Sequence, residues 1–264
     1  MEKLIKLVPR GSSSQSMFIL APIFAIFLTL LTGSIIFFLM GYNPSNALKI
    51  FFISPISNAY GISELLVKAT PLALIAMGLS FCFKNNIYNI GAEGQLTMGA
   101  IFGGGVGIYF YDISSVLILP GMIIAGVLGG ALWAMIPALL KTKFNTNEIL
   151  TSLMLAYIAL LILDYLVVGP WRDPDGFNFP KTRPFGESGR MPILFQGLRI
   201  HFGLIITLIL IAFSWFIYSK TIFGFQLKVS GFSPKAARFA GFNKNFLIFS
   251  AFAISGAFAG LAGV

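Results

Sequence analysis

Two polar segments between long apolar runs contain the residue types that could take part in chemistry. The first is 84–95, with the sequence Lys-Asn-Asn-Ile-Tyr-Asn-Ile-Gly-Ala-Glu-Gly-Gln. It is either an ordinary cytoplasmic turn or a break in a helix at membrane depth. Irregular backbone at that depth is tolerated only where it is buried in protein or faces water. Because a carboxylate inside a membrane is costly, Glu93 would then be a candidate functional residue.

The second segment lies within 221–245 and predicts a short, separate helix. Ser233 is a good helix N-cap, Pro234 suits the first helical position, and Gly241 is a natural stop after Phe239. The helix has two interpretations. Its thin, alanine-containing face could seat in a groove of a partner, or its basic residues could rest on anionic lipid.

Asp164 and the loop 169–200 are two further candidates, at the outer ends of the apolar runs. Asp164 lies near the outer end of one run. It either faces the bundle interior, a cavity or a base such as Arg172, or it is an interfacial acid that reaches water. The loop 169–200 is rich in turn formers and aromatics. It could dock a soluble binding protein, cover an outer gate, or be a structured loop without a partner.

Several chemistries have no residues to support them. The sequence contains no Gly-x-x-x-x-Gly-Lys phosphate loop, no His/Cys metal cluster and no Ser/His/Asp set. We therefore expect no catalytic residues, no metal and no cofactor in this chain, which is not expected to be an enzyme. If the chain serves ATP-driven transport, ATP must bind another subunit.

The composition indicates that the elements holding these segments lie in lipid. The 264 residues are 57% hydrophobic and only 10% charged, against about 25% charged in soluble domains. The net charge of +9 does not indicate nucleic acid, because the bases sit in short loops between apolar runs rather than along one polar face.

The apolar runs predict an all-α, polytopic transmembrane bundle, since about 20 apolar residues cross the hydrocarbon as a helix. The chain ends inside the last run, from which we expect a permease-like domain 17–264 that is incomplete at its C-terminus. Residues 1–16 form an N-terminal tail, in which 7–12 match a protease-cleavage linker. About seven spans are predicted: 17–40, 65–83, 94–111, 113–140, 150–168, 202–219 and 246–264.

Loop charges and small residues predict how these spans are arranged. With the N-terminus inside, eleven Lys and Arg residues fall in cytoplasmic loops and seven outside, which favours that orientation. Glycines spaced four apart let helix backbones approach closely. They predict helix contacts at Gly99, Gly103 and Gly107, at Gly126 and Gly130, and at Gly256 and Gly260.

Three segments together resemble the inner-membrane permeases of ABC importers for simple sugars, nucleosides and branched-chain amino acids, with the nucleoside branch closest. The segments are Tyr88–Gln95, the run Thr146–Ile149 with the following Leu153–Leu155, and Gly231–Gly241. The resemblance implies that the last segment couples to an ATPase subunit through Ser233, Pro234, Lys235, Ala236, Ala237, Arg238 and Gly241. It implies a translocation path or signature at Asn89, Gly91, Glu93, Gly94, Gln95, Asn147 and Glu148, to which we add Asp164.

The same resemblance implies the setting and the partners. The chain would be a multi-pass protein of a bacterial inner membrane, in contact with the lipid bilayer. It would pair with a second permease subunit, identical or different, with cytoplasmic ATP-binding subunits, and with a periplasmic or lipoprotein binding protein. A nucleoside is the favoured substrate, and a monosaccharide or branched-chain amino acid the alternative. An ion-coupled secondary carrier, which needs acids or bases paired inside the bundle, is a different mechanism that the sequence leaves open.

Overall fold

The described chain is entirely helical apart from its connections. The structure is a computed structural model that describes residues 15–177 and 179–264. The proposed linker at 7–12 lies outside these residues. The described chain forms two compact units, 15–62 and 63–264.

The first unit contains one long helix and a run of short ones. Helix α1 (Gln15–Leu39) is apolar on every side, as expected of a helix surrounded by lipid. It is followed by α2 (Pro44–Leu48), η1 (Lys49–Ile53) and η2 (Ser54–Ile56). Asn43 caps α2, and its Oδ1 accepts a hydrogen bond from Ser45 N at 3.0 Å. The segment 41–56, for which the sequence predicted only a loop, is therefore mostly helical.

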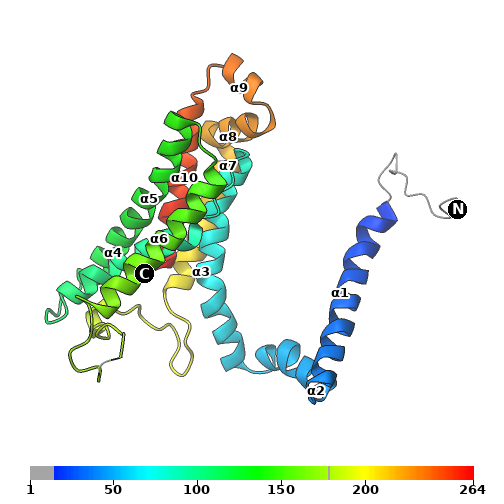
Figure 1. Cartoon of the computed structure of the whole chain (residues 1–264), viewed down its shortest axis with the longest axis vertical. Coiled ribbons are helices and arrows are strands. Elements are labelled where there is room, and N and C mark those ends of the chain that lie inside the picture. The colour runs from blue at the N-terminus through cyan, green and yellow to red at the C-terminus, as the bar shows by residue number, and fades with distance from the viewer. Residues whose placement is uncertain (1–14, 178) are drawn as a thin grey trace, which may run out of the picture. The chain divides into compact units, whose positions relative to one another are not determined.

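The second unit is a bundle built from long helices (Figure 1). Helix α3 begins within the first unit and continues into the second. The helices are α3 (Ala59–Lys84), α4 (Ala92–Tyr109), α5 (Ile118–Phe144), α6 (Glu148–Val168), η3 (Glu187–Gly189), α7 (Gly203–Lys220), α8 (Ile222–Phe232), α9 (Pro234–Phe239) and α10 (Lys244–Ala262).

Six helices in the described residues are long and apolar enough to cross a membrane: α1, α3, α5, α6, α7 and α10. They confirm the predicted polytopic helical bundle. The third predicted span, 94–111, is the helix α4, but α4 is not among the six. Its six glycines together with Glu93, Gln95 and Thr97 lower its hydropathy, and most of its residues are buried against other helices.

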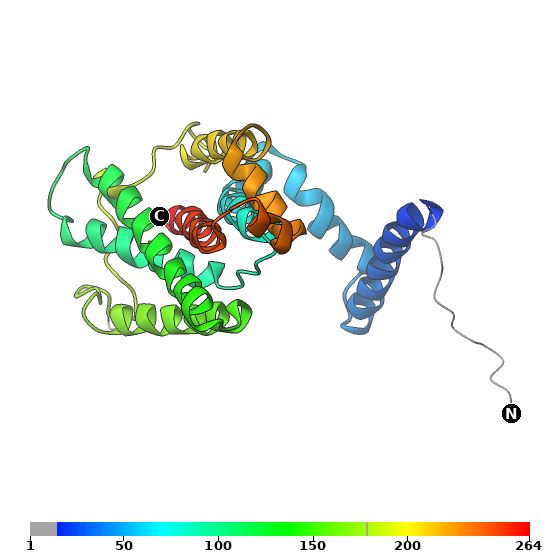
Figure 2. The same cartoon turned by 90° about the horizontal axis from the view of Figure 1, so that it is seen from above.

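Helix α10 lies at the centre of the second unit, with α4 and α5 on one side and α3 and α8 on the other (Figure 2). Its buried residues Leu247, Ala251 and Phe252 join Phe81 of α3 and Leu227 of α8 in one hydrophobic core. Since burial of such side chains contributes roughly 1.5–3 kcal/mol each, this core fixes the position of α10.

Glycines bring α4, α5 and α10 into backbone contact, as the spacing predicted. A Cβ on Gly130 of α5 would overlap the Gly256 carbonyl oxygen of α10, and a Cβ on Gly99 of α4 would overlap Gly260. Only hydrogen fits at these crossings. The three helices therefore form a rigid centre on which the polar segments are mounted.

Candidate functional site

Helix α9 is capped as its sequence predicts. The Ser233 hydroxyl accepts a hydrogen bond from Ala236 N at 3.3 Å, and Pro234 occupies the first turn. Gly241 has φ of +74°, the left-handed conformation that glycine adopts without strain. Phe242 N donates to Ala237 O at 3.0 Å across this stop. The helix is thus a defined element whose two ends are fixed by side-chain and backbone hydrogen bonds.

Most of α9 faces away from the bundle. Ala237 is buried, whereas Lys235, Ala236 and Arg238 are exposed. Phe232 and Phe239, at either end, are 91% and 92% exposed. Helix α9 lies at the end of the second unit beyond α5 and α10, and the loop 169–200 lies at the opposite end (Figure 1). An exposed element that combines cations with large apolar rings has the composition of a protein-binding surface.

The segment 85–91 is irregular, its residues alternate between buried and exposed, and the buried Asn89 amide is bonded inside the protein. The side chains of Asn89 and Gln95 exchange hydrogen bonds at 3.0 and 3.1 Å. Asn89 Nδ2 also donates to Ser255 Oγ at 3.0 Å, and Asn89 Oδ1 also accepts from Gly91 N at 3.0 Å. All four hydrogen bonds of the Asn89 amide are therefore made, which is the full capacity of that group.

These partners place the segment well inside the bundle. Ser255 lies eleven residues beyond the start of α10 at Lys244, which corresponds to about 16 Å along the helix axis. On the other side, Ile90 N donates to Ser152 Oγ of α6 at 3.1 Å. Gly91 and Gly94 lie directly against the backbone of α6 at Ser152 and Ala156. The segment is thus a break between α3 and α4 whose polar groups at Asn89 and Ile90 bond to helices on both sides.

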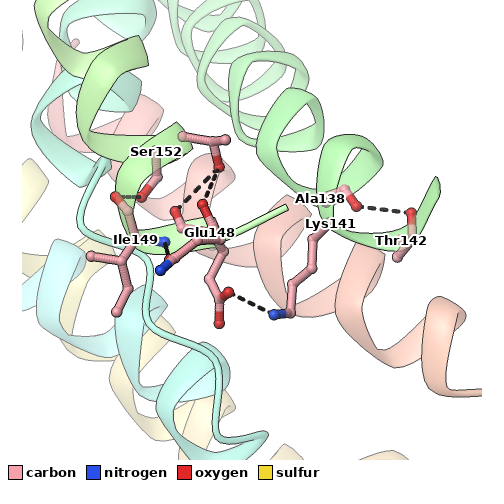
Figure 3. A network of polar contacts seen from close by, with 8 residues as sticks. Ala138, Lys141, Thr142, Glu148, Ile149 and Ser152 are labelled. Atoms are coloured by element: carbon pink, nitrogen blue, oxygen red, sulfur yellow. Dashed lines mark hydrogen bonds and ion pairs between the residues drawn. The ribbon is translucent and has the colours of Figure 1, made fainter. Parts of the chain in front are cut away.

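Glu148 is held by a lysine from the preceding helix. Lys141 Nζ at the end of α5 lies 2.6 Å from Glu148 Oε2 in the first turn of α6 (Figure 3). The Asn147 side chain caps α6 by accepting from Ile149 N at 2.9 Å. Asn147 and Glu148 therefore fix the turn between α5 and α6, next to Ser152.

The two remaining acidic candidates are exposed on the surface of the chain. Glu93 lies in the first turn of α4, and Asp164 lies on α6. Neither makes an ion pair in the part of the chain that the structure describes.

The loop 169–200 is a structured cap on the opposite end. Asp173 is buried and lies 3.8 Å from Lys181 Nζ and 3.9 Å from Arg183 Nε. Phe185 packs onto α4, where a Cβ on Gly107 would approach its ring at 2.8 Å. The exposed aromatics of this loop were noticed in the sequence, but the ion pairs at Asp173 were not. Their spacing of eight and ten residues in an irregular loop carries no signal.

His201 lies just before α7, at the edge of this loop. Its partial burial lowers the pKa of the imidazole below the ordinary value of 6.5, because desolvation disfavours the charged form. No group of three or more metal-ligating side chains occurs among the described residues.

Comparison with known proteins gives one family and several relatives. The family described as branched-chain amino acid transport system / permease component matches residues 61–264. A glucose ABC transporter permease protein (TsgB13) of Haloferax volcanii is 32% identical over 92% of this chain and 66% of its own length. A guanosine ABC transporter permease protein (NupP) of Bacillus subtilis is 34% identical over 93% of this chain. A nucleoside ABC transporter permease protein (NupB) of Lactococcus lactis is 30% identical over 93%.

The chain spans 70% of the length of the guanosine and nucleoside relatives and just under two thirds of the glucose relative. No solved structure matches it.

Proposed function

The chain belongs to the family of permease components of branched-chain amino acid transport systems, and from that premise we propose that it is the substrate-conducting subunit of an ATP-driven importer. It is a multi-pass membrane protein, consistent with six apolar helices of spanning length in its described residues. A permease subunit of an ABC importer works with ATP-binding subunits on the cytoplasmic side and with a protein that delivers the substrate.

The exposed helix α9 is the observation that carries this proposal. It is capped at both ends, turns Lys235, Arg238 and Phe239 outward, and buries only Ala237 against the bundle. A short, capped helix that projects from the end of a bundle can move as one body when a partner subunit binds it. We assign it the role of contact with the ATP-binding subunit, and this role places the α9 end in the cytoplasm.

We propose a nucleoside as the substrate and a monosaccharide as the second candidate. Two of the three relatives described above are named for guanosine or nucleoside and one for glucose. The amides of Asn89 and Gln95 do not supply the recognition in this conformation, since they are bonded to each other and to Ser255. Their proposed role is to brace the broken segment against α4 and α10.

Glu93 and Asp164 support the ATP-driven mechanism over an ion-coupled carrier. A carrier of that kind needs acids or bases paired inside the bundle. Both acids are exposed on the described chain. The buried acid Glu148 does pair with Lys141, at 2.6 Å, but the pair lies where α5 ends and α6 begins rather than midway along the bundle.

The test is charge reversal on α9 in the assembled importer. Arg238→Glu should leave the folded permease intact, because Arg238 is exposed, and should lower substrate-stimulated ATP hydrolysis and uptake at least about tenfold, equivalent to ~1.4 kcal/mol of coupling. Lys143→Glu is the matched control: it makes the same charge change on an exposed lysine at the end of α5, outside α9. Equal effects of the two variants would refute the role of α9.

A further inference from the structure

Helix α8 rests directly on the chain that leads into the broken segment. Gly231, in the last turn of α8, lies so close to Lys84 that an added Cβ would overlap the Lys84 carbonyl oxygen and lie 3.3 Å from the Asn85 carbonyl carbon. Backbone meets backbone here with no side chain between. A shift of α8 therefore cannot occur without moving Lys84 and Asn85 or opening this contact.

The same contact joins two elements discussed above. Helix α8 ends at Phe232 and α9 begins at Pro234, with only Ser233 between them. On the other side, Asn85 precedes Asn89 by four residues, and Asn89 is bonded to α4 and α10. The path from the exposed helix to the buried amides is thus short and made of packed backbone.

The Asn85 side chain is buried without a partner from the part of the protein that the structure describes. It is only 6% exposed, and neither polar atom of its amide bonds to another described residue. A buried polar group without a partner is destabilising, because it gives up its hydrogen bonds to water. Such groups in a native protein call for an explanation.

A hollow of about 140 Å³ beside Asn85 offers room for a second arrangement. Its polar lining comes from Ser230 on α8, Lys141 on α5, Lys244 on α10 and Asn86. Ser230 belongs to the same turn of α8 as Gly231, so a shift of α8 at the Gly231 contact also moves the Ser230 hydroxyl relative to the Asn85 amide.

We propose that Asn85 is a positioning residue that sets the balance between two positions of α8 and α9, and that its amide gains a hydrogen-bond partner across the hollow only in the second. In the position described here the unpartnered amide favours movement. In the other position the new bond holds segment 85–91 displaced. The Gly231 contact passes this displacement toward Asn89. The inference rests on the proposed function of α9 as the contact with the ATP-binding subunit.

The test is Asn85→Leu in the assembled importer, measured by thermal unfolding and by the ratio of substrate taken up to ATP hydrolysed. Leucine has a similar size and no polar atoms. We expect Tm to rise by about 2 °C or more, on the scale of one unpaired polar group in a protein of this size. We expect the uptake-to-hydrolysis ratio to fall at least fivefold, since the second position loses its hydrogen bond.

Ser214→Ala is the matched control, because the Ser214 hydroxyl in α7 is also buried with no partner among the described side chains and backbone, but lies outside this path. It should leave the ratio unchanged. If Asn85→Leu raises Tm but leaves the uptake-to-hydrolysis ratio unchanged, the amide has no part in coupling. If it lowers Tm, the amide already has a partner. Either result overturns the inference about Asn85 and leaves the proposed function untouched. A wild-type assembly without ATP-driven uptake overturns the proposed function as well.

Discussion

Replacing Asn89 by leucine should strongly destabilise the permease. The Asn89 amide makes all four of its hydrogen bonds inside the protein, to Gly91 N, Ser255 Oγ and both atoms of the Gln95 amide. Leucine has the same branching and the same number of side-chain heavy atoms, so the substitution removes the bonds without leaving a cavity. The groups left behind stay buried, since Gln95 and Ser255 are each 1% exposed.

The magnitude follows from the number of groups left without a partner. Each buried donor or acceptor that loses its partner costs about 1–3 kcal/mol. Four such groups cost about 4 kcal/mol at the lower end of that range, against a total stability of about 5–15 kcal/mol for a typical domain. With about 2–4 °C per kcal/mol for a protein of this size, Tm should fall by about 8–16 °C.

The assay is thermal unfolding of the detergent-purified permease, followed by tryptophan fluorescence, for Asn89→Leu, Gln95→Leu and the double variant. Because the two amides satisfy each other, the double variant should be much less unstable than the sum of the single ones, with a coupling of about 2 kcal/mol. Additive effects, or a fall in Tm below about 2 °C for Asn89→Leu, would refute the reasoning that these amides brace the break.

Three further predictions concern other parts of the second unit. Glu148→Gln leaves the partly buried ammonium of Lys141 without its carboxylate and should cost about 1–3 kcal/mol, seen as a lower Tm; an unchanged Tm would show that the pair contributes nothing. Gly130→Ala forces α5 and α10 apart and should cost about 1–3 kcal/mol, whereas Gly121→Ala, with its nearest neighbour 3.7 Å from the added Cβ, should cost much less; equal costs would contradict the packing. Burial lowers the pKa of His201 in the folded chain. Stability should therefore be lost as the pH falls from about 6.5, the pKa of histidine in the unfolded chain, through the lower pKa of the folded chain. If His201→Gln shows the same pH dependence of Tm as the wild type, His201 is not the cause.

Local rules were sufficient to predict α9 and the glycine crossings. The cap at Ser233, the proline after it and the stop at Gly241 act within one or two helical turns, so the sequence contains all the information needed. The glycines at Gly130 and Gly256 are similar, because their four-residue spacing marks the faces where helices meet. In both cases the structure confirms the prediction.

The setting of segment 85–91 was left as two alternatives because its partners are remote in sequence. Ser152 and Ser255 are ordinary helical serines whose meaning depends on α6 and α10 lying beside the break. Helix α8 and the contact of Gly231 with Lys84 were missed for the same reason. The span assigned to 94–111 was suggested by length, whereas α4 is rich in glycine and more than half of its residues are buried by neighbouring helices.

The sequence also could not place the acids Glu93 and Asp164. The sequence left an internal role open for both acids, because it does not give the direction in which a side chain points on a largely apolar helix. The structure places both on the surface of the chain. Their proposed part in a translocation path now depends on the second permease subunit, which would face some of these surfaces.

The most direct measurement of the central claim is uptake of a radiolabelled nucleoside into proteoliposomes that contain the assembled importer and its binding protein. Uptake should require ATP on the α9 side of the membrane and should persist when a protonophore removes the proton gradient. Uptake that proceeds without ATP and stops when the gradient is removed would contradict the account.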